Sequence, residues 1–216
     1  MRKCILLLLM ISLVFCAACG RDKASLADAV ETTLGINGDG TVEEATIEPF
    51  EAEYYSETEL EAYIQAAVEA FNQANPQQVP ETVSGEKEEA AEPPDAITIL
   101  GVKAEHGKAR MDLLYQSVDL YNAFNESDLK AMTLDRAVSS GIFSNLHMIK
   151  MAGGKGDASV DEMMQKEDLY VVITQQKRRI VTGGKLVYYT ENVTEEDAYT
   201  AVTAADGPSI LLFKMK

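Results

Sequence analysis

The chain has few basic residues. It carries 19 lysines and arginines against 35 aspartates and glutamates, and its formal net charge is −16 at pH 7. Such a surface repels phosphate backbones and anionic lipid headgroups, which excludes nucleic acid as a partner and excludes charge as the means of holding a membrane. The one basic cluster, residues 177–179, is predicted to be the solvated rim of a hairpin.

Histidine is scarce as well. His106 falls in an expected turn and His147 after an expected helix, so neither has a partner at the spacing of a metal site or a catalytic triad. The motifs H-E-x-x-H and G-x-S-x-G are absent, and no glycine stretch has the G-x-x-x-x-G-K-[ST] spacing of a phosphate loop. The glycines within residues 153–161 are predicted to form a polar loop, and residues 183–184 to close a hairpin. The sequence assigns no metal and no cofactor.

Cysteine is confined to the first 19 residues, at Cys4, Cys16 and Cys19. The opening stretch "MRKCILLLLMISLVFCAACG" has a positive start, an apolar run over residues 5–15 and then small residues. This is the layout of a secretory signal. A helix that spans a membrane needs about 20 apolar residues, so a permanent transmembrane anchor is the weaker interpretation.

The stretch "AACG" resembles a bacterial lipobox, in which the chain is cleaved before a cysteine that carries lipid. Cleavage would fall between Ala18 and Cys19, and Cys16 occupies the position where such boxes usually have leucine. An ordinary signal peptide that ends in cysteine is the alternative. We predict a signal peptide over residues 1–18 and lipid on Cys19. The protein would then be anchored at the extracytoplasmic face of the cell membrane.

Lipidation also settles the cysteine chemistry. Cys4 and Cys16 leave with the signal peptide and the sulfur of Cys19 carries lipid, so the folded domain has no thiol. A disulfide scaffold, a cysteine nucleophile and a thiolate zinc site are excluded together. Loss of Arg2 and Lys3 leaves 17 basic residues against 35 acidic ones, a net charge of −18.

The remaining chain is long enough for one ordinary domain. Residues 19–28 carry charges and small side chains and are predicted to be a tether, and residues 29–216 a single domain. Four of the six prolines bracket an acidic run within residues 76–95, which predicts a disordered loop. We place this loop within the domain, because the part before it is too small to fold alone.

The apolar pattern predicts antiparallel β-hairpins packed with a few helices, an α+β fold. Hairpins are expected over residues 30–50 and 97–115, where alternating strands flank turns that contain glycine. A capping box begins at Ser56, and the helix after it has an apolar face from Leu60 to Phe71 that includes Tyr63. Further helices are expected over 117–124 and 133–140, and strands over 169–174, 178–182, 185–190, 199–203 and 210–213.

The strongest functional motif is "GINGDGTVEEAT", residues 35–46. Asn37 and Asp39 match ligand positions of a calcium loop, but the first ligand position is a glycine and the last a threonine. Glu43 and Glu44 are nearby carboxylates that could compensate in part. The flanks have the pattern of strands, whereas an EF-hand needs helices. We therefore predict a plain hairpin turn, with a calcium site as the alternative.

Four stretches together carry a resemblance: "NGDGTVEEATIEPF", "YYSETELEAYIQAAVEAFN", "LYQSVDLYNAFN" and "GGKLVYYTENVT". In this order the chain is similar to small uncharacterised cell-envelope lipoproteins of clostridial-type Gram-positive bacteria. The likeness covers nearly the whole mature chain. It implies the membrane address and the single domain, and it implies no catalytic residues.

Two functions fit these observations. The first is a non-catalytic binding or structural module of the envelope, whose partner is an envelope protein, a peptide or a cell-wall polymer. The second is a carboxylate-dependent envelope hydrolase that acts on glycan, which needs two acids about 5 to 9 Å apart in a cleft. The lack of any catalytic motif favours the first.

Overall fold

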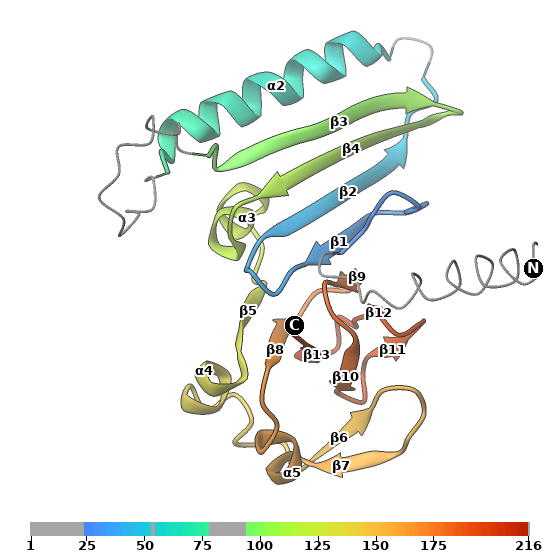
Figure 1. Ribbon diagram of the computed structural model, residues 1–216. Helices are drawn as coiled ribbons and strands as arrows, with labels where there is room; N and C mark the ends of the chain where they lie inside the picture. Colours follow the sequence, from blue (N-terminus) through green and yellow to red (C-terminus); the bar gives the residue numbers. More distant parts are fainter. Residues whose placement is uncertain (1–23, 53–54, 78–93, 216) are drawn as a thin grey trace, which may run out of the picture.

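The computed structural model describes residues 24–52, 55–77 and 94–215. They form two β-sheets with four helices, so the predicted α+β fold is confirmed (Figure 1). The predicted signal peptide and most of the loop predicted at 76–95 lie outside these residues. The helices are α2 (Glu57–Ala74), α3 (Val118–Asn125), α4 (Leu134–Ser139) and α5 (Val160–Met164).

Both sheets combine strands from distant parts of the chain. The seven-stranded sheet has the order β11 (Thr194–Glu195), β12 (Thr200–Val202), β9 (Arg179–Thr182), β1 (Thr33–Ile36), β2 (Val42–Pro49), β4 (Lys108–Tyr115) and β3 (Ile97–Glu105). The six-stranded sheet has the order β5 (Lys130–Thr133), β8 (Leu169–Thr174), β13 (Ser209–Lys214), β10 (Leu186–Tyr189), β6 (Met148–Met151) and β7 (Asp157–Ser159). Within the described residues the pair β1–β9 is parallel and the other pairs are antiparallel.

The two predicted hairpins are confirmed as β1–β2 and β3–β4. The β3–β4 turn places His106 at φ 53° and Gly107 at φ 73°. Positive φ at both turn residues suits the right-handed twist of the flanking strands, which explains the glycine. A bulge interrupts β3 between Ile99 and Gly101, and bulges of this kind protect an edge strand against pairing with another chain.

Helix α2 runs along β3, the edge strand of the seven-stranded sheet (Figure 1). The side chain of Ser56 accepts a hydrogen bond from the backbone N–H of Glu59, as its position before the helix predicts. Ile64 and Val68 are buried beneath the helix. The side-chain amide of Asn72 bonds both the N–H and the carbonyl of Ile97, at 2.8 and 2.9 Å. Helix α2 therefore also caps one end of the exposed edge of β3.

The main hydrophobic core joins the two sheets. It combines Ile36 and Leu113 of the seven-stranded sheet with Val172, Leu211 and Phe213 of the six-stranded sheet. A second core cluster lies on the other face of the six-stranded sheet, beneath α4 and α5. Strands β8 and β13 thus bury both faces, which explains their unbroken apolar sequences. Because one core serves both sheets, the described chain folds as one unit.

The hairpin predicted at Gly183 and Gly184 is wrong. These glycines connect β9 to β10, and the two strands belong to different sheets. A Cβ on Gly184 would lie 1.8 Å from the carbonyl oxygen of Lys214, and one on Gly183 would lie 3.1 Å from Cα of Asn37. The glycines are therefore present because two backbones approach closely, rather than because a tight turn needs positive φ.

Two further predictions in the C-terminal half are corrected. Of the basic residues 177–179, the first two lie in the connection from β8 to β9 and Arg179 begins β9. These strands again lie in different sheets, so the basic residues do not form a hairpin rim. The polar loop predicted over 153–161 contains the turn between β6 and β7, and then strand β7 itself and the start of α5. A capping box in which Ser159 and Glu162 bond reciprocally begins α5.

Candidate functional site

The residues predicted to carry lipid and to be cleaved, Cys19 and Ala18, lie outside the described residues. The predicted tether over 19–28, however, differs from the structure in its second half. Ala24 and Leu26 are only 5% and 2% exposed. They pack with Ala45 and Val181 on the face of the seven-stranded sheet that is turned away from the main core. The chain is thus attached to the sheet from Ala24 onward.

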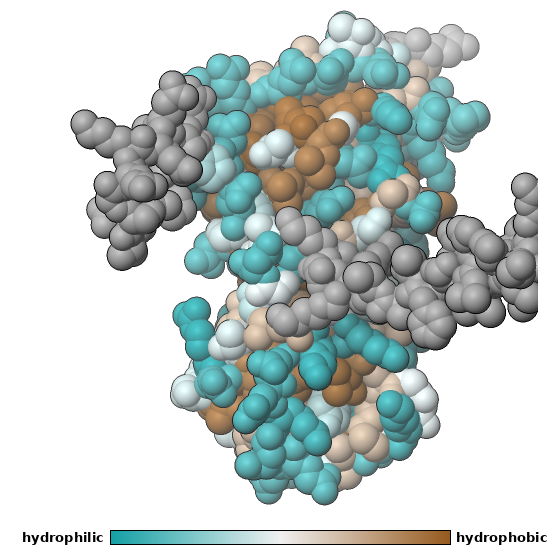
Figure 2. Space-filling view, viewed as in Figure 1, coloured by the Kyte–Doolittle hydropathy of each residue, from teal (hydrophilic) through white to brown (hydrophobic). Residues whose placement is uncertain are grey.

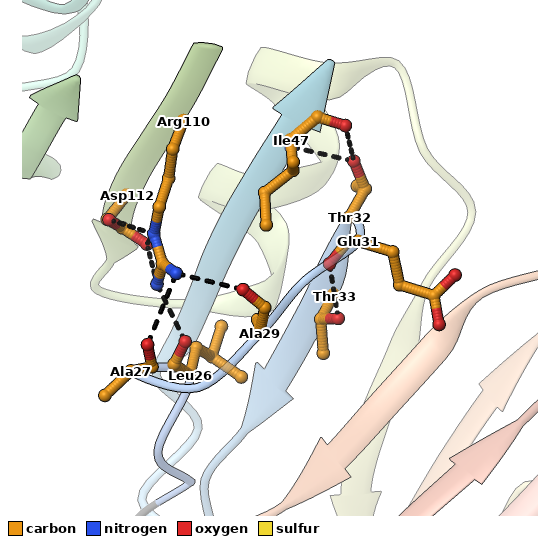
Figure 3. Close-up of polar contacts among 9 residues, drawn as sticks. All are labelled: Leu26, Ala27, Ala29, Glu31, Thr32, Thr33, Ile47, Arg110 and Asp112. Carbon is orange, nitrogen blue, oxygen red and sulfur yellow. Dashed lines mark hydrogen bonds and ion pairs between the residues drawn. The ribbon is translucent and has the colours of Figure 1, made fainter. Parts of the chain in front are cut away.

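Arg110 holds this segment in place (Figure 3). Its guanidinium donates hydrogen bonds to the carbonyl oxygens of Leu26, Ala27 and Ala29, at 2.7, 3.3 and 3.1 Å. The carboxylate of Asp112, two residues along β4, accepts from the same guanidinium at 2.8 Å. The planar, multi-donor guanidinium suits this arrangement, because one group can bond several carbonyls of an irregular segment at once. The carbonyl of Leu26 also accepts a hydrogen bond from the backbone N–H of Ala29, at 3.0 Å. We call these contacts the Arg110 clamp.

The far end of the segment is fixed by β1. The backbone N–H of Ala24 donates to Oδ1 of Asn37 at 2.8 Å. A Cβ on Gly35 would lie 2.8 Å from Cβ of Ala24, which is closer than real Cβ atoms come to such a neighbour. Residue 35 must therefore be glycine for the segment to lie against β1. The sequence signal for this contact was present, but the glycine was interpreted as part of a degenerate calcium loop.

The opposite face of the sheet has an apolar groove of about 390 Å³. Helix α2 covers β3 and leaves part of β2 and β4 open, so the groove has α2 as one wall and these two strands as its floor. Thr46 faces Met111 and Glu48 faces Ala109 across the floor. Its lining residues are Thr46, Glu48, Phe50, Leu60, Tyr63, Ile64, Ala67, Ala109, Met111 and Phe124.

Tyr63 marks the difference between prediction and structure in this groove. The spacing of apolar residues along the helix placed Tyr63 on the buried face, yet its side chain is 74% exposed. Phe50 stacks on Tyr55, with ring centroids 4.6 Å apart, and Phe124 packs edge-on against Phe71 at 5.2 Å. The groove therefore offers aromatic and aliphatic surface to a partner and, within the described residues, a single carboxylate, that of Glu48.

A polar cleft of about 490 Å³ lies between α3, β5 and β8. Two carboxylates, those of Asp119 and Asp128, line it together with Lys130, Arg136 and Tyr170. The two oxygens of Asp128 accept hydrogen bonds from the side chain of Thr174 and the backbone N–H of Gln175, both at 3.2 Å. Asp128 therefore has a structural role in joining the loop before β5 to the end of β8.

A buried carboxylate, Glu44, lies on β2 beneath the main core and is 5% exposed. The hydroxyl of Tyr115 donates to it at 3.2 Å, and the side-chain amide of Asn125 donates to that hydroxyl at 3.0 Å. Burial raises the pKa of Glu44, against the lowering effects of the Tyr115 hydrogen bond and the charge of Arg178. Burial, followed by the charge of Glu44, raises the pKa of Tyr115 and Tyr121.

The predicted hairpin turn at residues 37–40 is confirmed. The backbone N–H and the hydroxyl of Thr41 donate to Oδ1 of Asp39, at 3.0 and 2.7 Å. This is the local bond by which aspartate favours turns. Strands rather than helices flank the turn. Glu44 points into the core, so it is not available to complete a calcium loop.

Neither histidine belongs to a cluster. His106 is exposed in the β3–β4 turn and His147 is exposed just before β6 in the other sheet. Over the described ranges no group of three or more histidine, cysteine, aspartate or glutamate side chains is placed to hold a metal ion. In the basic cluster, Arg178 donates to the side chain of Gln176, and Arg179 pairs with Glu196 at 2.9 Å and with Glu31 at 3.5 Å.

Comparisons with protein-family models, with curated proteins and with solved structures find no match to this chain. Among the helices of the described chain, none is long and apolar enough to cross a membrane.

Proposed function

We propose that the protein is a non-catalytic binding module, anchored by lipid on Cys19 at the extracytoplasmic face of a bacterial cell membrane. The partner is an envelope protein or peptide that places apolar side chains in the groove between α2 and strands β2 and β4. The lipobox order of the N-terminal residues supports the anchor. The apolar groove is the observation that carries the binding function.

The chemistry of the groove favours a protein or peptide over a cell-wall polymer. Ile64, Phe50, Met111 and Phe124 line it with aliphatic and aromatic surface, whereas a glycan needs many polar partners. Exposed aromatic side chains beside a hollow are the usual anchors of a protein interface, because they bury large areas at a small cost in conformational entropy. Tyr63, at the wall of the groove and largely exposed, is such a residue.

Cross-linking in intact cells tests the binding function. A photoreactive amino acid at position 63 should attach one defined envelope protein on illumination. The matched control carries the same amino acid at Met148, which is 55% exposed on β6 in the other sheet. The same set of attached proteins from both positions would contradict a specific groove.

The anchor has its own test. We expect Cys19→Ala to abolish incorporation of labelled fatty acid and to leave a larger, uncleaved precursor, because both lipid transfer and cleavage would depend on that cysteine. Cys16→Ala, three residues earlier, is the control and should be processed normally. Normal labelling of the Cys19→Ala protein would refute the anchor.

The hydrolase remains the second candidate because Asp119 and Asp128 share the polar cleft. If the cleft cleaves glycan, purified protein should release reducing ends from cell-wall glycan, and both Asp119→Asn and Asp128→Asn should abolish the release. We expect no release from the unaltered protein, since Asp128 is already held by Thr174 and Gln175.

A further inference from the structure

The first residue that the structure describes, Ala24, lies very close in sequence to the proposed anchor. Ala24 is packed on the sheet, and five peptide steps separate it from Cys19. An extended chain covers at most about 3.6 Å per residue, so these steps reach about 18 Å. A headgroup layer takes up about 5 to 8 Å of this distance. If Cys19 carries the lipid, the point where the chain joins the sheet must stay close to the bilayer.

The rigidity of the attachment determines which face is held there. From Ala24 to Ala29 the segment is fixed by the Arg110 clamp and by the bond from Ala24 to Asn37. The domain therefore has no flexible hinge between Ala24 and the sheet. The anchored segment and the apolar groove lie on opposite faces of the sheet, because side chains alternate along β2 and β4.

Exposed apolar side chains are present on the anchored side. Val30 directly follows the clamped segment and is 76% exposed. Leu114 lies on the same face of β4 as Arg110 and Asp112 and is half-buried, and Leu100 at the bulge of β3 is 50% exposed. Figure 2 shows hydrophobic residues gathered over β3 and β4.

We propose that this face, the one carrying residues 24–30, is a membrane-contacting surface whose occupant is the lipid bilayer itself, with Val30 in the interface. The inference depends on the proposed lipidation of Cys19. The covalent tether drives the contact by raising the local concentration of the face at the bilayer. Electrostatic attraction to the bilayer does not drive the contact, because the net charge of the mature chain is −18. The groove on the opposite face is left open toward the cell exterior, where a partner can reach it.

The sequence offers a clean reporter, since it has no tryptophan and the mature chain has one cysteine, Cys19. Mature Val30→Trp protein would be coupled through Cys19 to a maleimide lipid in phosphatidylcholine vesicles that contain brominated chains. We expect blue-shifted emission and loss of most of the fluorescence on coupling. Met148→Trp is the control, because position 148 is also exposed, at 55% against 76% for Val30, and lies in the other sheet; it should keep its emission.

Three outcomes would overturn the proposal: no quenching at position 30, equal quenching at positions 30 and 148, or unchanged quenching after ten Gly/Ser residues are inserted between Lys23 and Ala24. The last variant should release the face from the bilayer. Because chemical coupling replaces lipidation in this experiment, its failure leaves the anchor intact. Failure of the Cys19→Ala labelling test would instead refute the anchor and leave the vesicle result standing.

Discussion

The two faces of strands β2 and β4 hold their charged side chains in different ways. On the core face, Glu44 is buried with neutral hydroxyls, and burial raises its pKa. On the opposite face, Arg110 and Asp112 keep 25% and 21% of their side chains exposed and bond directly to each other. A buried charge without a full ionic partner opposes folding, whereas a partly exposed ion pair whose arginine also bonds three carbonyls stabilises the segment that it touches. The core face supplies stability and the clamped face supplies attachment.

The largest expected difference between the faces is in hydrophobic packing. Leu113 is fully buried in the main core, and its neighbour Leu114 points to the other face and is half-buried. Leu113→Ala should lower the free energy of unfolding by about 2 to 5 kcal/mol, because it leaves a cavity. Leu114→Ala should cost about 1 kcal/mol, because less apolar area is removed from contact. Denaturant titration of both variants measures this, and equal losses would remove the distinction between the faces.

A smaller effect is expected at the Arg110 clamp. Arg110→Ala removes hydrogen bonds to three carbonyls and to Asp112, and bonds from a charged donor contribute about 1.5 to 3 kcal/mol. We expect a loss of this size together with faster proteolysis near residues 24–30. Arg110→Lys should recover little, since an ammonium cannot span the same acceptors.

The control for the clamp is Lys108→Ala, an exposed residue on the same face of β4. Substitutions at such surface positions usually change stability by less than about 0.5 kcal/mol. If Arg110→Ala leaves the proteolysis rate of the N-terminal segment unchanged, the clamp does not hold the segment. The inferred orientation at the membrane would then lose its structural basis.

Local patterns in the sequence predicted local structure well. The hairpins β1–β2 and β3–β4 follow from alternation and turn residues, and the start of α2 follows from Ser56. The hairpin predicted at Gly183 and Gly184 was wrong, because a glycine pair is equally suited to a tight turn and to close contact between backbones. The positions of Asn37 and Lys214, both distant from the glycines in sequence, decide between them.

The candidate sites were harder to predict because each depends on contacts between distant residues. Residues 24–28 have the composition of a tether, and their burial depends on Arg110, which is 84 residues after Leu26. Tyr63 fits the apolar face of α2, but that helix lies over β3 and leaves the floor of the groove open. Helical periodicity predicts which side chains share a face, and it does not predict how much of the facing sheet the helix covers.

The smallest expected difference between the two faces is the pH dependence of stability that Glu44 causes. Since burial raises its pKa, the native state binds a proton at Glu44 more tightly than the unfolded chain does. Its contribution to stability is therefore complete below about pH 4.3, the pKa of an unfolded glutamate, and is lost as the pH rises through the raised native pKa.

Glu44→Gln keeps the shape and an acceptor for Tyr115 but cannot ionise. Relative to the unaltered protein, this variant should become progressively more stable as the pH rises from 4 to 8. The control is Glu48→Gln, at an exposed position four residues further along β2, which removes a carboxylate from the same face of the strand without altering the core. Thermal unfolding across this pH range measures the difference, and a Glu44→Gln curve parallel to that of the unaltered protein would show that the core face tolerates the charge without cost.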